Sequence, residues 1–164
     1  MDRYADYFLN SSSSVVQLEL LDITHNAFSR DYHVVRNSGR DGLTVTLETG
    51  QERDYEYYPL RINPVGVRGD LDAGLRIDLG DLGEIIPAEI ENVKASSYFA
   101  TKPVVTYRVY RSDDLSFPIF GPLVLEIIDI NVSETGASFT ASAPVISVLT
   151  TGEFYNYDTL RGFL

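Results

Sequence analysis

The amino-acid sequence predicts a mainly β protein, a β-barrel or sandwich with one amphipathic helix packed against it. Apolar and polar residues alternate in several short runs, which is typical of half-buried strands. Gly, Asn and Asp clusters separate these runs, and one segment instead repeats its apolar residues every three or four positions. A chain of 164 residues is long enough to bury the core that such a domain requires.

Strands are expected wherever apolar and polar residues alternate one by one. In the first run Val16, Leu18 and Leu20 alternate with polar side chains, so that one face of the strand is apolar. Regularly spaced short strands with turn signals between them favour an antiparallel sheet. The further runs lie at 43–48, 75–79, 105–109, 123–132 and 138–143.

The helix is expected at about 82–96. Its apolar residues recur at helical spacing, with Asp81 as a possible N-cap. Pro87 leaves two alternatives, because proline inside a helix removes a backbone hydrogen bond. Either the helix bends there, or it begins near Pro87. The apolar residues are Leu82, Ile85, Ile86, Ile90 and Val93.

We divide the chain into an N-terminal arm (1–14), one domain (15–152) and a C-terminal arm (153–164). Both arms carry aromatic side chains, which tend to leave water. Two destinations remain open: the arms fold back onto their own domain, or they contact neighbouring subunits. The second gives the expected inter-subunit contacts Tyr4, Tyr7, Phe8, Phe154, Tyr155, Tyr157, Phe163 and Leu164.

The charge and composition of the chain limit the kinds of partner that it is expected to bind. A net charge of −11 opposes a broad phosphate-binding surface, so no specific nucleic-acid binding is expected. No apolar run is long enough for a membrane span. Among the 13 basic residues only Lys94 and Lys102 are lysines, and an excess of arginine favours protein interfaces.

The sequence contains few of the motifs that carry chemistry. Cysteine is absent, and neither a G-x-S-x-G motif nor a phosphate-binding glycine loop occurs. His25 and His33 could face each other across a hairpin, with Asp22 or Asp31 near, but zinc needs a third convergent ligand. We expect no enzyme activity, no catalytic residue, no metal site and no cofactor.

Several segments, in order, resemble a known family. The chain is similar to phage minor tail or baseplate (tail-tip) proteins, which are catalogued mainly as a domain of unknown function, and to the amino-terminal domain of lambdoid minor tail proteins. The resemblance covers almost the whole chain. The segments are Val16–His25, Tyr32–Asn37, Tyr57–Ile62, Leu75–Leu79, Pro103–Tyr110 and Leu160–Leu164.

The resemblance implies a structural component of a bacteriophage tail tip or baseplate. Such a protein has a tail-tube-like fold and forms part of a ring, as a trimer or hexamer, that connects the tail tube to the hub and receptor-binding apparatus. The implied partners are copies of itself and tail-tube, distal-tail and hub proteins. The implied location is the virion, after synthesis in the host cytoplasm. Some lambdoid relatives hold an iron–sulfur cluster in an added domain, which a chain without cysteine does not carry over.

If such a ring encloses a channel for DNA, an acidic inner wall would repel phosphates. We therefore expect several acidic side chains to face a lumen. The candidates are Asp70, Asp72, Asp78, Glu89 and Glu91.

Two alternatives remain. The chain could be a carbohydrate-binding β-sandwich module on the virion, with Tyr55, Tyr57 and Tyr58 as a stacking platform, although alternation places Tyr58 on the opposite side from the other two. A small hydrolase is the weaker alternative, and it would depend on His25.

Overall fold

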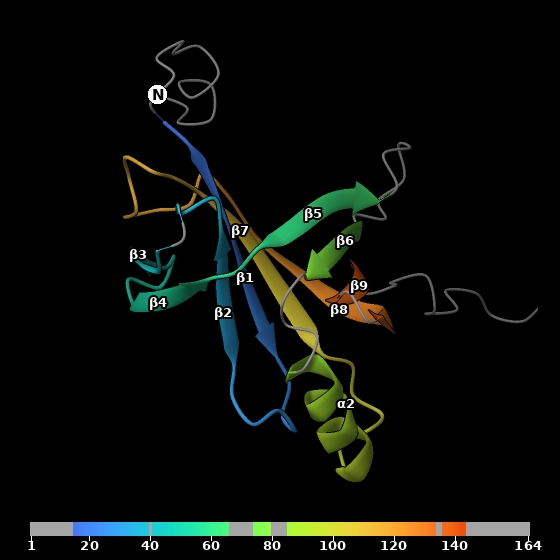
Figure 1. The fold of residues 1–164 in the computed structure, drawn as a ribbon. Coiled ribbons are helices and arrows are strands. Elements are labelled where there is room, and N and C mark those ends of the chain that lie inside the picture. The colour runs from blue at the N-terminus through green and yellow to red at the C-terminus, as the bar shows by residue number, and fades with distance from the viewer. Residues whose placement is uncertain (1–14, 40, 66–73, 80–84, 134–135, 144–164) are drawn as a thin grey trace, which may run out of the picture.

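The computed structural model describes residues 15–39, 41–65, 74–79, 85–133 and 136–143, which form nine strands and one helix (Figure 1). The two arms expected at 1–14 and 153–164 lie outside these residues. The elements are β1 (Gln17–Thr24), β2 (Tyr32–Arg36), β3 (Leu43–Thr46), β4 (Glu52–Tyr57), β5 (Leu60–Val65), β6 (Gly74–Leu79), α2 (Ile85–Ala95), β7 (Val104–Arg111), β8 (Phe120–Ser133) and β9 (Gly136–Ser142).

The nine strands form one sheet in the order β3-β4-β2-β1-β7-β8-β9-β6-β5. Neighbouring strands are antiparallel, except that β2 and β4 are parallel. A mainly β fold with a single short helix confirms the fold class expected from the alternating pattern.

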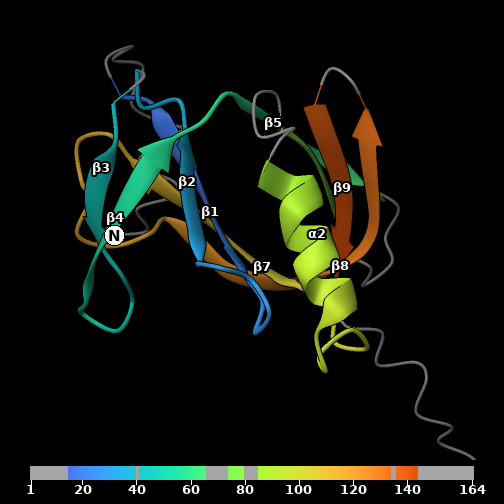
Figure 2. The ribbon, with the colours of Figure 1, turned by 60° about the horizontal axis from the view of Figure 1, so that its bottom comes forward.

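The sheet is strongly curled. Only Tyr58 and Pro59 separate β4 from β5, although these strands lie near opposite edges of the sheet. The sheet must therefore bend round to bring the two edges together, and Figure 2 shows its two halves facing each other. As a result both faces of β1 are covered, with Leu20 buried on one side and Leu21 on the other.

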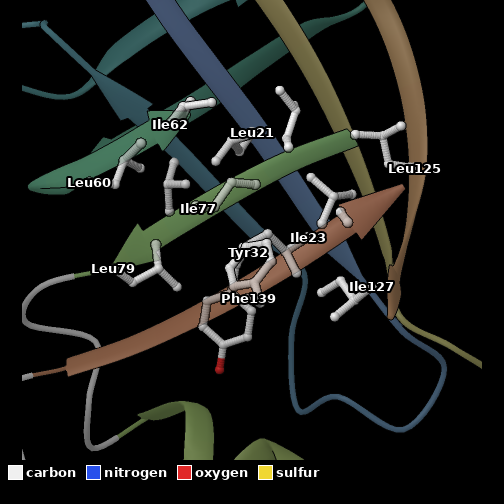
Figure 3. Packing of buried hydrophobic residues seen from close by; sticks show 14 residues of the cluster. Leu21, Ile23, Tyr32, Leu60, Ile62, Ile77, Leu79, Leu125, Ile127 and Phe139 are labelled. Atoms are coloured by element: carbon white, nitrogen blue, oxygen red, sulfur yellow. The ribbon is translucent and has the colours of Figure 1, made fainter. Parts of the chain in front are cut away.

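The larger hydrophobic cluster fills the inside of the curl (Figure 3). Side chains from seven strands meet there, namely β1, β2, β5, β6, β7, β8 and β9. Their burial is the main favourable contribution to folding. The buried members are Leu21, Ile23, Tyr32, Val34, Leu60, Ile62, Leu75, Ile77, Leu79, Val105, Leu125, Ile127, Phe139 and Ala141.

A smaller cluster lies on the other face, where the β3–β4 hairpin covers β1, β2 and β7. Tyr55 and Tyr110 are its largest buried side chains. The hydroxyl of Tyr110 donates a 2.8 Å hydrogen bond to the carbonyl of Thr46, which attaches the hairpin to β7. The remaining buried members are Leu18, Leu20, Val35, Val45 and Leu47.

Helix α2 lies at one end of the curled sheet (Figures 1 and 2). Its described part runs from Ile85 to Ala95, within the expected 82–96, while Asp81 and residues 82–84 lie outside the described residues. Pro87 is the third described residue of the helix. A proline in the first turn of a helix costs no intrahelical hydrogen bond. Residues 80–84 lie outside the described part of the chain, so the two alternatives that Pro87 leaves stay open.

In the part of the chain that the structure describes, no helix is long and apolar enough to cross a membrane.

Candidate functional site

An apolar pocket lies between α2, the loop 96–103 and the inner face of the sheet. Its volume is about 210 Å³. Pockets for drug-sized ligands are larger, roughly 300–1,000 Å³, so this one suits a few inserted side chains better. Its walls are formed by Ile23, Phe28, Glu89, Ile90, Val93, Lys94, Phe99, Ala100, Thr101, Lys102, Pro103, Ile127, Ile130 and Phe139.

Three of the pocket residues are aromatic and two are lysines. Phe139 belongs to the larger cluster and Phe28 packs against it, whereas Phe99 is 72% exposed. Lys94 and Lys102 are the only lysines of the chain, and both line this pocket. The pocket therefore combines an apolar interior with two cationic side chains.

Glu89 on α2 connects the helix to the loop between β1 and β2. The backbone N–H of Ser29 donates to its Oε2 at 3.0 Å, and the Ser29 hydroxyl donates to its Oε1. The Tyr32 hydroxyl donates to the same Oε1 at 2.6 Å, and the Asn92 amide donates to Oε2 at 3.2 Å. Hydrogen bonds to a charged acceptor are the stronger kind, so this carboxylate fixes one wall of the pocket.

The protonation of Glu89 follows from these contacts. Burial acts to raise the pKa of Glu89, but the hydrogen bonds from Ser29, Tyr32 and Asn92 outweigh it and lower the pKa to about 2. The side chain is only 4% exposed. The expectation that Glu89 faces a lumen is therefore wrong, because this carboxylate points into the fold and is satisfied there.

His25 holds the loop that borders the pocket. The backbone N–H of Ala27 donates to its Nδ1 at 3.1 Å, so the ring proton is on Nε2. That nitrogen lies 3.0 Å from the carbonyl oxygen of Thr101 and donates to it. His25 thus joins the end of β1 to the loop before β7, and it does not face His33 as one alternative supposed.

His33 instead belongs to a buried charge network with Asp22, its partner in the β1–β2 register. The two side chains are joined by a 2.7 Å hydrogen bond, in which Nδ1 of His33 donates to Oδ1 of Asp22. Oδ2 of Asp22 accepts from Arg108 and, at 3.2 Å, from Arg53. Arg108 also donates its Nε to Glu48 at 2.8 Å. The network connects the β3–β4 hairpin to β1, β2 and β7, so its role is structural.

The tyrosines proposed as a carbohydrate platform do not form one. Tyr55 is 2% exposed and belongs to the smaller cluster, and its buried hydroxyl has no hydrogen-bond partner among the described residues. Burial, followed by the charge of Asp22, raises the pKa of Tyr55. Tyr57 packs against the smaller cluster and Tyr58 against the larger one, so the three rings share no open surface.

The other acids expected at a lumen are only partly described. Asp78 on β6 lies near Arg76 at 3.4 Å, and Glu91 on α2 accepts from Lys94 at 2.8 Å. Both carboxylates are well exposed. Asp70 and Asp72 lie outside the described residues.

A second surface feature is the outer face of β8, β9 and the beginning of β7, which points away from the larger cluster and lies beyond the part of β7 that the β3–β4 hairpin covers. We call it the bare face, because none of the described residues forms an element that covers it. On β8 it presents Val124 and Ile128, which are 50% and 53% exposed. Its other residues are Val104, Thr106, Glu126, Asp129, Asn131, Ser138, Thr140 and Ser142.

The places of two pocket residues, the exposed Phe99 and the buried Glu89, were not predicted from the sequence. Phe99 lies in a loop without periodicity, and only its place beside Tyr98 and near Lys102 hinted at a surface aromatic group. The burial of Glu89 depends on Ser29 and Tyr32, which are far away in the sequence.

Among the described residues, no group of three or more His, Asp or Glu side chains is placed to hold a metal ion. No curated protein matches the chain significantly. A family model described as "Domain of unknown function (DUF1833)" matches residues 5–149, which is most of the sequence. The chain therefore belongs to the DUF1833 family.

Proposed function

We propose that this chain is a structural component of a bacteriophage tail tip or baseplate. Several copies form a ring that connects the tail tube to the hub and receptor-binding apparatus. The chain acts there through contacts with copies of itself and with adjoining tail proteins, and not through catalysis.

The observation that carries the proposal is the bare face. An exposed face on β8, β9 and the beginning of β7 leaves Val124 and Ile128 in water, and exposed apolar surface favours association. The neighbouring side chains on β9 are Ser138, Thr140 and Ser142, which are small.

The sequence resemblance supports the same function. The segments that resemble phage minor tail proteins include β1, β2 and β7, which are adjacent in the sheet. The curled sheet with one helix also agrees with the tail-tube-like fold that the resemblance implies. The net charge of −11 suits a ring through which DNA passes, and the exposed Asp78 and Glu91 remain candidates for its inner wall.

The proposal is tested on tailed phage particles from the genome that encodes the chain. Gold-labelled antibody against the chain should mark the tail tip in negative-stain images, and mass spectrometry should find the chain in purified particles. A particle preparation that lacks the chain, or labelling away from the tail, would contradict the proposal.

A glycan array with the recombinant chain distinguishes the carbohydrate-binding alternative. The proposed structural role predicts no specific binder on the array. Saturable binding of one glycan class, together with no label on the particles, would favour that alternative instead.

A further inference from the structure

We propose that the pocket under α2 is the docking site for the aromatic segment 153–164 of the same chain. This assigns the C-terminal segment to its own domain, which is one of the two destinations that the sequence leaves open. The inference does not depend on the function in a phage tail.

The described chain ends beside the pocket. Ala141 on β9 is the register partner of Ile127, and Ser142 is the partner of Glu126. Ile127 is a wall of the pocket, and Glu126 accepts a 3.2 Å hydrogen bond from Lys102 at its rim. The chain therefore leaves the sheet next to the pocket.

The connecting stretch can span the distance to the pocket, and it is short enough to keep the segment close to the pocket of its own molecule. Residues 144–153 link Ala143 to Phe154, and an extended stretch of this length spans at most about 36 Å. A short connection gives the attached segment an effective concentration on the order of millimolar. Weak side-chain contacts then suffice to occupy the pocket.

The chemistry of the segment matches that of the pocket. The segment carries four aromatic residues and two leucines but also Glu153 and Asp158. The pocket offers an apolar interior to the rings and Lys94 and Lys102 to the carboxylates. Each lysine already has an exposed ion pair, with Glu91 and Glu126, but such pairs contribute only about 0–1 kcal/mol and exchange partners readily.

Phe99 gives an independent reason to expect an occupant. Its ring borders the pocket and is 72% exposed, next to Tyr98, which is 46% exposed. Aromatic pairs add about 0.5–1.5 kcal/mol beyond the area that they bury. An incoming ring from the segment would cover Phe99 and pair with it.

The test uses the full chain, which has no cysteine of its own. Ala100 lies on the pocket wall, and the variant Ala100→Cys is combined with Phe163→Cys in one molecule. The matched control combines Thr49→Cys, an exposed position in the β3–β4 turn, with the same Phe163→Cys. A short bis-maleimide should link the first pair within the monomer at least about fivefold more than the control pair, because docking raises the local concentration of the two thiols.

A mixture of chains that carry only Ala100→Cys or only Phe163→Cys shows whether docking occurs between copies. Crosslinked dimers in that mixture, without an intramolecular product in the double variant, would overturn the proposal in favour of exchange between copies. Equal crosslinking of the pocket and control pairs would overturn it as well and leave the pocket to another partner.

Hydrogen exchange provides a second measurement that needs no cysteine at the pocket. The double variant Phe154→Ser/Phe163→Ser should exchange the amides of 96–103 faster than the unmodified chain, while those of β1 stay unchanged. Identical exchange in 96–103 would contradict docking.

Discussion

Tyr32 on β2 donates its hydroxyl to the Glu89 carboxylate on α2 at 2.6 Å, and this contact joins the only described helix to the sheet. The Tyr32 ring belongs to the larger hydrophobic cluster, whereas its hydroxyl reaches out of the cluster to the helix. Burial and the hydrogen bond to Glu89 both raise the pKa of Tyr32, so the hydroxyl stays protonated and keeps donating at neutral pH.

Tyr32→Phe should therefore destabilise the fold while leaving the ring in place. Loss of a hydrogen bond to a charged group costs about 1.5–3 kcal/mol of unfolding free energy. Urea unfolding followed by circular dichroism measures this loss. The control is Tyr98→Phe in the exposed loop, which should change the unfolding free energy by less than about 0.5 kcal/mol. Equal effects of the two substitutions would show that the Tyr32 hydroxyl does not hold the helix.

Glu89→Gln should lose stability in a manner that depends on pH. The pKa of Glu89 is lowered from about 4.5 to about 2 in the folded chain, so its ionised form stabilises the fold above pH 4.5. That contribution disappears as the pH falls from about 4.5 to about 2, because the folded chain then takes up the proton.

The difference in unfolding free energy between the unmodified chain and Glu89→Gln should thus be largest near pH 7 and shrink across this window. Urea unfolding at a series of pH values measures it. Glu91→Gln on the exposed side of the same helix is the control, and its difference should stay near zero. A difference for Glu89→Gln that is constant with pH would contradict the assigned hydrogen bonds.

The alternating pattern predicted six of the nine described strands but not β2, β4 and β5, and the helical period placed Glu89 wrongly. Alternation of Leu18, Leu20 and their neighbours reflects local burial, which is encoded residue by residue. The position of Glu89 depends instead on donors from Ser29 and Tyr32. Because glutamate is usually exposed on a helix, periodicity alone assigned Glu89 to solvent.

The same reason explains the pairing of His33. The sequence allowed His25, Asp22 and Asp31 as neighbours, and only the β1–β2 register selects Asp22. The arginines that complete the network come from β4 and β7, which the sequence separates widely from β1. The alternation of residues within one strand does not specify which distant strand it pairs with.

Asp22→Asn should destabilise the chain strongly. Asp22 is 4% exposed and accepts from Arg108, which is also buried, so the substitution removes the charge that balances a buried guanidinium. Breaking a buried ion pair on one side costs about 3–5 kcal/mol. Asp78→Asn, which alters an exposed pair with Arg76, should cost less than about 1 kcal/mol in the same urea titration. A small effect of Asp22→Asn would mean that Glu48 alone balances Arg108.

Gly121→Ala should cost more than Gly50→Ala. Both glycines have positive φ, 96° and 79°, which strains any side chain. A Cβ at Gly121 would lie 2.5 Å from the Tyr107 carbonyl oxygen, whereas a Cβ at Gly50 meets nothing within 4 Å. The shared strain is of the order of 1–2 kcal/mol, and the clash adds to it only at Gly121. Thermal unfolding of both variants measures the difference, and equal melting temperatures would show that β7 shifts to make room.

Ile128→Asp should separate assembly from folding. The side chain is 53% exposed on the bare face, so a carboxylate there remains in water and the unfolding free energy should change by less than about 1 kcal/mol. In an interface the same carboxylate would lose its water without gaining a partner, which costs several kcal/mol per contact. Incorporation into phage particles, measured by mass spectrometry after complementation of a deletion, should therefore fall sharply. Thr49→Asp in the exposed β3–β4 turn is the control and should be incorporated normally. Normal incorporation of Ile128→Asp would show that the bare face is not buried against a neighbouring subunit.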